Sequence, residues 1–159
     1  MLVFRVGWAK PVPVNMYRFK NPKRGMAVTA LAGPVSNVLI TLVFLLLYGA
    51  LYVLLRSSAA GGYFLEMIEL TAYMSLGLAV FNLIPLPPLD GSMVPFALMS
   101  DESYYKLMRY ERYGGLVLMV LMMTGVLGKP VSTVVSSIYS NLIPVAQFAC
   151  DLVVKLFYK

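Results

Sequence analysis

Asp90 is the carboxylate whose sequence surroundings are best suited to chemistry. It follows the run Asn82-Leu-Ile-Pro-Leu-Pro-Pro-Leu89 and precedes Gly91, at the end of a long apolar segment. A helix through Leu76–Phe81 cannot continue past Pro85 and the prolines after it, because proline lacks a backbone donor and pushes the preceding residue toward extended geometry. An ionisable group on irregular backbone beside an apolar segment is costly and usually functional. Asp90 is therefore a candidate metal ligand or catalytic carboxylate.

A second polar notch interrupts the first long apolar run, at Ala32-Gly33-Pro34-Val35-Ser36-Asn37. Gly33 and Asn37 are four residues apart and share one face of a helix. The glycine permits close approach of another backbone, and the asparagine offers an amide to whatever approaches. The same spacing also suits a helix-packing notch without chemistry, and the residues alone do not separate these two interpretations.

The composition indicates a multi-pass membrane protein. Of the 159 residues, 60% are hydrophobic and 13% are charged, which is atypical of soluble globular domains. The sequence contains no histidine, the residue on which most zinc sites and general-base designs rely. The single cysteine, Cys150, excludes an internal disulfide and is best interpreted as a small apolar side chain in a helix.

The predicted fold is an all-α integral membrane protein with about four transmembrane helices and a short extended N-terminal segment, forming one membrane domain over residues 1–159. Residues 1–25 are a basic segment with β-branched pieces that could pair as a hairpin; an unstructured leader is the alternative. Residues 85–112 form a loop and a charged connector, which we expect to be an amphipathic helix. The predicted transmembrane helices are 26–55, 63–84, 113–128 and 131–157. Turns are expected at Asn21–Gly25, Ser57–Gly62 and Gly128–Pro130.

The distribution of basic residues predicts the orientation. Six lysines and arginines precede the first apolar run with no acidic residue among them, which is typical of a cytoplasmic juxtamembrane segment and not of a nucleic-acid-binding surface. We expect both ends of the chain to be cytoplasmic. The notch at Gly33–Asn37 and the run Asn82–Gly91 then meet at the cytoplasmic end of one helical hairpin.

The acidic residues do not complete a metal site around Asp90. A catalytic zinc takes about three protein ligands and an open position. Glu66 and Glu69 are predicted at the opposite side of the membrane, and Asp151 lies near the C-terminus. The sequence therefore contains one part of a metal site.

Three segments together resemble the site-2 protease family, the intramembrane zinc metalloproteases. The run Asn82–Gly91 resembles the family's Asn-x-x-Pro-x-Pro-x-Leu-Asp-Gly motif. Residues 32–37 look like its Gly-Pro-x-x-Asn motif, and Gly7–Asn15 resembles the segment after its catalytic helix. The sequence departs from the family pattern in one large respect, because the His-Glu-x-x-His helix expected just before Met1 is absent from it.

The resemblance implies that Asp90 is the third ligand of one zinc ion, beside two histidines of the absent helix, whose glutamate would be the general base. Zinc lowers the pKa of bound water and polarises the scissile carbonyl. The substrate would be a transmembrane protein, unwound and held along the extended segment Val3–Val14, in a prokaryotic cell membrane. This chain alone is then expected to be inactive. The residues implied to bind substrate or support the site are Gly33, Pro34, Asn37, Asn82, Pro85 and Gly91.

Two other functions remain open at this stage. The chain could be a non-catalytic membrane scaffold or regulatory protein that keeps the fold without its metal. Asp90 would then bond to backbone amides near Gly91. A transporter is the weaker alternative, because no further buried charge lines a pathway.

Overall fold

The computed structural model describes residues 20–96, 99 and 113–157, and these residues form helices joined by short turns, without a strand among them. The predicted all-α membrane fold is confirmed. The extended segment predicted before residue 20 and most of the connector predicted up to residue 112 lie outside the described residues. The elements are α1 (Pro22–Leu55), α2 (Ala59–Asn82), η2 (Asp90–Ser92), α3 (Met93–Phe96), a helix at Tyr113–Met123, and α5 (Gly128–Phe157).

Helix α1 begins inside the turn predicted at Asn21–Gly25. Pro22 is its first residue, and the Gly25 N–H donates to the Asn21 carbonyl oxygen at 2.9 Å. A proline at the first helical position loses no hydrogen bond, since that N–H has no partner within the helix, and its φ angle already suits the helix. The sequence reasoning treated Pro22 as a turn residue and so placed the start of the helix four residues too late.

Helix α2 also begins before its predicted start, at Ala59 instead of Tyr63. The Ser58 hydroxyl caps it by accepting a hydrogen bond from the Gly61 N–H at 3.0 Å, so Gly61 lies in the first turn of the helix and not in the predicted loop. The helix ends at Asn82, two residues before the predicted end at 84 and just before the prolines that forbid its continuation.

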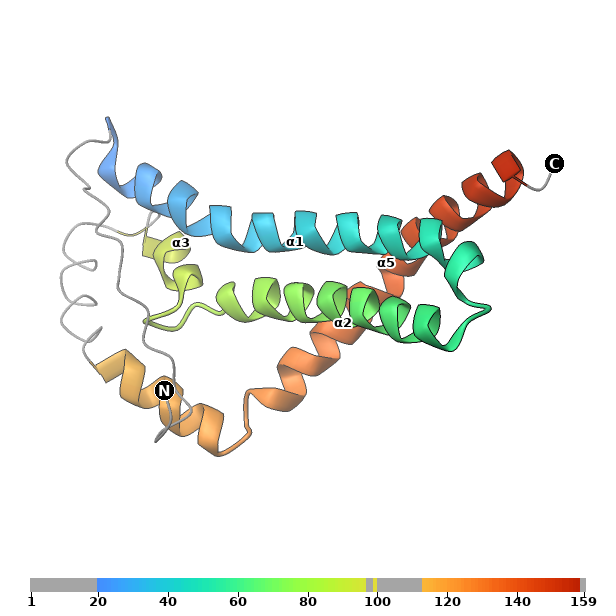
Figure 1. The fold of residues 1–159 in the computed structure, drawn as a ribbon. Helices are drawn as coiled ribbons and strands as arrows, with labels where there is room; N and C mark the ends of the chain where they lie inside the picture. The colour runs from blue at the N-terminus through green and yellow to red at the C-terminus, as the bar shows by residue number, and fades with distance from the viewer. Residues whose placement is uncertain (1–19, 97–98, 100–112, 158–159) are drawn as a thin grey trace.

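Polar groups set the register between α1 and α2, which lie side by side and antiparallel (Figure 1). The Thr41 hydroxyl lies 2.9 Å from the Asn37 carbonyl oxygen of its own helix and 3.2 Å from the Ala72 carbonyl oxygen of α2. The Ser75 hydroxyl of α2 donates to the Asn37 carbonyl oxygen at 3.0 Å. Thr41 and Ala72 are both 0% exposed, so these interhelical bonds lie in a fully buried level of the hairpin.

The third apolar segment is described as a helix over Tyr113–Met123, followed by a turn at 124–127 in which Gly125 has φ +69°. At 1.5 Å per residue the helical part extends about 16 Å, about half of a hydrocarbon core of ~30 Å. The predicted span 113–128 is therefore described as a shorter helix. The predicted turn at Gly128–Pro130 is instead the first turn of α5, because the change of direction is made at residues 124–127, where Gly125 adopts the left-handed conformation.

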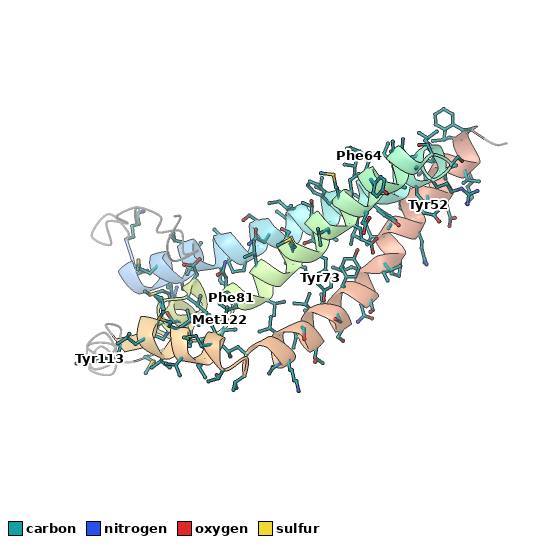
Figure 2. All side chains as sticks on the ribbon, turned by 60° about the horizontal axis from the view of Figure 1, so that its bottom comes forward. Tyr52, Phe64, Tyr73, Phe81, Tyr113 and Met122 are labelled. Carbon is teal, nitrogen blue, oxygen red and sulfur yellow. The ribbon has the colours of Figure 1, made fainter. Side chains whose placement is uncertain are left out.

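Helix α5 crosses both helices of the hairpin obliquely (Figure 1). At the crossing, Gly49 of α1 lies against the Ala146 carbonyl group and Ala149, so a Cβ at residue 49 would overlap the backbone of α5. On α2, the Tyr73 ring packs edge-on against Tyr139 with centroids 5.3 Å apart, and its hydroxyl lies 3.2 Å from the Ser136 hydroxyl. Figure 2 shows Tyr73 on the side of α2 that faces α5.

The three long helices are suited to a membrane. Arg24–Leu55, Ala59–Asn82 and Gly128–Phe157 are each long and apolar enough to cross a bilayer. Large apolar side chains cover the outside of α1, among them Val35, Leu39, Val43 and Leu46. The core is correspondingly small, with Leu45, Ala72 and Ala146 at its centre. The chain is a membrane protein, and its orientation across the bilayer stays a prediction.

Candidate functional site around Asp90

Asp90 lies at the end of a tight loop that starts where α2 stops. The loop makes short-range backbone bonds, from the Leu86 N–H to the Ile84 carbonyl at 2.8 Å and from the Leu89 N–H to the Leu86 carbonyl at 2.9 Å. The Pro87–Pro88 peptide bond is cis. The loop enters η2 at Asp90, so the carboxylate is presented on irregular backbone, as the proline pattern predicted.

Ser92 closes the turn that carries Asp90, while the Asp90 carboxylate stays exposed. The Ser92 N–H and hydroxyl both donate to the Leu89 carbonyl oxygen, at 3.0 and 2.8 Å, and Ser92 is 2% exposed. The Asp90 side chain is exposed and accepts no hydrogen bond within the described part of the chain. The bonds to backbone amides near Gly91 that the scaffold alternative predicted are not among its contacts there. The carboxylate is therefore accessible to solvent and is not committed to a hydrogen bond with the described residues.

Gly33 in α1 lies beside Asp90, which begins η2 after the end of α2. A Cβ placed on Gly33 would lie 3.3 Å from the Asp90 Oδ2 atom. η2 and α3 both contact α1, so the loop folds back along the N-terminal part of that helix (Figure 1). The hairpin topology predicted that the two polar segments face each other, and the structure brings them into contact. The role of these residues as a site stays a prediction.

Gly91 holds the loop against the end of α2. A Cβ at Gly91 would lie 2.5 Å from the Leu83 carbonyl carbon and 2.7 Å from the Asn82 carbonyl oxygen. Real side chains essentially never approach a backbone so closely. Glycine is therefore required after Asp90, because a side chain at residue 91 would overlap the backbone at the end of α2.

The other predicted residues lie around this contact in different ways. Asn37 is one turn beyond Gly33 and uses its carbonyl oxygen to bind Ser75, while its half-buried amide makes no hydrogen bond among the described residues. Asn82 is the last residue of α2 and contributes its carbonyl oxygen to the Gly91 contact. Pro34 is buried inside α1, and Pro85 is exposed in the loop.

The sequence reasoning missed two features of the site. One is the bond from Ser75 to Asn37, whose residue types are ordinary for a membrane helix. The other is Gly114, at the start of the helix Tyr113–Met123, which packs against the Pro87 backbone. The Gly114-Gly115 pair signals a flexible or closely packed position, but no pattern in the sequence indicates which glycine makes a contact.

The residues present do not form a complete zinc site. The sequence has no histidine, and no group of three histidine, cysteine, aspartate or glutamate residues comes together within the part of the chain that the structure describes. A catalytic zinc takes about three protein ligands. Asp90 has the right chemistry and exposure for one of them.

Comparison with known proteins is consistent with this arrangement. The model of Peptidase family M50 matches residues 49–128, half of the chain, including the loop with Asp90. The chain is 35% identical over 126 residues to a Bacillus subtilis (strain 168) protein named "Putative zinc metalloprotease YwhC", covering 78% of this chain and 58% of that protein. No solved structure matches. The chain belongs to peptidase family M50, the site-2 protease family of intramembrane metalloproteases.

Proposed function

We propose that this chain supplies the carboxylate ligand and its supporting loop to an intramembrane zinc metalloprotease, with Asp90 as the ligand. The substrates would be membrane-spanning proteins. The chain covers 58% of the length of the relative it matches. The remaining zinc ligands and the general base would come from residues outside this 159-residue sequence. The chain by itself is then expected to hold zinc poorly.

The observation that carries the proposal is the placement of the Asp90 carboxylate. It is exposed, its backbone is held against the end of α2 through Gly91, its Oδ2 atom lies beside Gly33 of α1, and it makes no hydrogen bond within the described residues. Metal sites hold their ligands to within about 0.2 Å. A carboxylate fixed at its backbone and free at its oxygens meets that need, whereas a purely structural aspartate would be expected to accept hydrogen bonds.

The test compares Asp90→Asn with Asp151→Asn in the full natural protein, purified from membranes. Asp151 is an exposed carboxylate near the C-terminal end of α5, and Figure 1 places that end of α5 opposite α3 and the Asp90 loop. Zinc retention is measured at free zinc concentrations set by a chelating buffer. Cleavage is measured on a dye-labelled transmembrane peptide with a Gly-Pro pair in its helix.

We expect Asp90→Asn to abolish cleavage and to weaken zinc retention at least tenfold, with Asp151→Asn unchanged in both. If Asp90→Asn cleaves the peptide and keeps its zinc, Asp90 is not a ligand. If the unmodified full protein holds no zinc and cleaves nothing, the scaffold alternative replaces the protease.

A further inference from the structure

Gly114 lies in none of the three segments that resemble the protease motifs, yet it contacts the loop that carries Asp90. It is buried at the start of the helix Tyr113–Met123. A Cβ placed on it would lie 2.5 Å from the Pro87 carbonyl oxygen, 2.7 Å from the Pro87 Cβ and 2.9 Å from the Pro87 carbonyl carbon. We infer that Gly114 is a positioning residue, through which this helix braces the Asp90 loop. The inference rests on the proposed role of Asp90.

The contact is of a kind that cannot absorb a side chain cheaply. Below 3.0 Å something must shift, and the shift is cheap only when the neighbouring atom belongs to the end of a flexible side chain. Two of the three atoms facing Gly114 are backbone atoms of Pro87, and the third is part of its ring. Pro87 is followed by Pro88, and both rings restrict their own φ angles. Any side chain at residue 114 must therefore displace the loop or the helix as a whole.

A displacement of the Pro87 backbone would also move the backbone of Asp90. The Leu89 N–H donates to the Leu86 carbonyl oxygen at 2.9 Å, which closes a turn around Pro87 and Pro88. The next residue after that turn is Asp90. Because Gly91 is held against the Asn82 and Leu83 carbonyl groups, the far end of the loop cannot follow the movement. A shift at Pro87 is thus taken up between the turn and Gly91, which is where the carboxylate is attached.

Three glycines from three parts of the chain therefore hold this loop. Gly91 fixes its end on α2, Gly33 leaves room for the carboxylate beside α1, and Gly114 supports its middle from the helix Tyr113–Met123. Gly33 and Gly91 belong to the recognised motifs. Gly114 adds a contact from a helix outside the α1–α2 hairpin, whereas Gly33 and Gly91 connect the loop to the hairpin itself.

The neighbouring residue provides a matched control. Gly115 is exposed, and a Cβ placed on it meets nothing within 4 Å. Gly114→Ala and Gly115→Ala are the same substitution in the same helix, and both raise helix propensity. They differ in the contact with Pro87. We would make both variants, with Asp90→Asn beside them, in the full natural protein.

The first measurement is the affinity for Zn²⁺ in a chelating buffer, beside the thermal unfolding midpoint. Loss of an outer contact to a metal ligand typically weakens metal binding about 10- to 100-fold. We expect a loss of that size for Gly114→Ala and none for Gly115→Ala, with each affinity measured well below the unfolding midpoint of the variant. Equal zinc affinities of the two folded variants would overturn the inference.

The second measurement does not depend on zinc. In a Cys150→Ser background, Pro87→Cys is combined with Gly114→Cys or with Gly115→Cys. The Cβ atoms at 87 and 114 would start 2.7 Å apart, and a displacement of about 1 Å brings them to the ~3.8 Å typical of a disulfide. We expect oxidation to cross-link the 114 pair and not the 115 pair. Equal cross-linking of the two pairs would overturn the contact.

The two proposals fail in different ways. If Asp90→Asn loses zinc while Gly114→Ala and Gly115→Ala bind it equally, the positioning role is wrong and the proposed function stands. If Asp90→Asn keeps its zinc, the proposed function fails and the positioning role fails with it, whatever the cross-linking shows.

Discussion

Gly33 offers a substitution whose effects on stability and on the site should have opposite signs. The residue lies inside α1, where glycine is less favourable than alanine by about 1 kcal/mol. Its missing side chain faces the Asp90 Oδ2 atom, which a Cβ would approach to 3.3 Å. That distance is tighter than most real Cβ contacts, but the atom belongs to an exposed side chain that can move. Gly33→Ala should therefore raise the free energy of unfolding while it displaces the carboxylate.

The size of the displacement decides the effect on metal binding. An alanine at residue 33 requires the neighbour to give by a few tenths of an ångström, which is comparable to the ~0.2 Å tolerance of a metal–ligand distance. We expect zinc affinity to fall about tenfold, which corresponds to about 1.4 kcal/mol. A leucine adds three more heavy atoms where Oδ2 now lies. Gly33→Leu should turn the carboxylate away and lower zinc affinity by a factor of at least about 100, the upper end of the range for supporting contacts.

The assay is the chelator-buffered zinc titration on the full natural protein, with the unfolding free energy measured on the same samples. The diagnostic pattern is a graded loss of zinc affinity from glycine to alanine to leucine, together with unchanged or increased stability for alanine. Equal zinc affinity of the alanine and leucine variants would refute the reasoning, because it would mean that the carboxylate does not use the space beside Gly33. A fall in stability for Gly33→Ala would show that the position is packed more tightly than its contact distance indicates.

Two further predictions concern the packing that supports the site. Combining Thr41→Val with Ser75→Ala removes both hydroxyls that bridge α1 and α2. Interhelical hydrogen bonds in membranes average about 0.6 kcal/mol and reach about 1.7. The free energy of unfolding of the double variant should therefore fall by about 1 to 2 kcal/mol in a denaturant-detergent titration. An unchanged free energy would show that these bonds do not set the register of α1 and α2. Gly49→Ala should lower the unfolding midpoint by several degrees because its Cβ would overlap the Ala146 carbonyl group, whereas Gly77→Ala, with nothing within 4 Å, should leave the midpoint unchanged or raise it. Equal midpoints would contradict the close crossing of α1 and α5.

Helix ends show where sequence reasoning was accurate and where it was not. The end of α2 was placed within two residues, at 84 instead of Asn82, because several prolines in succession stop a helix whatever surrounds them. The starts of α1, α2 and α5 were placed three or four residues late, because Pro22, Gly61 and Gly128 were interpreted as turn residues. Proline and glycine are tolerated in a first helical turn, where backbone N–H groups need no partner from the same helix.

The sequence by itself determined the membrane class, the all-α fold and the position of Asp90 on irregular backbone. Each of these depends on local physics, on the length of apolar runs and on the geometry of proline. Only the tertiary structure decided that Gly33 faces the Asp90 carboxylate, that Ser75 binds the Asn37 carbonyl, and that Gly114 rather than Gly115 supports the loop. Composition and spacing cannot distinguish Gly114 from Gly115, because the two residues are of the same type and adjacent in the sequence. They differ in the direction that the missing side chain would take, and that direction is set by how the helices pack.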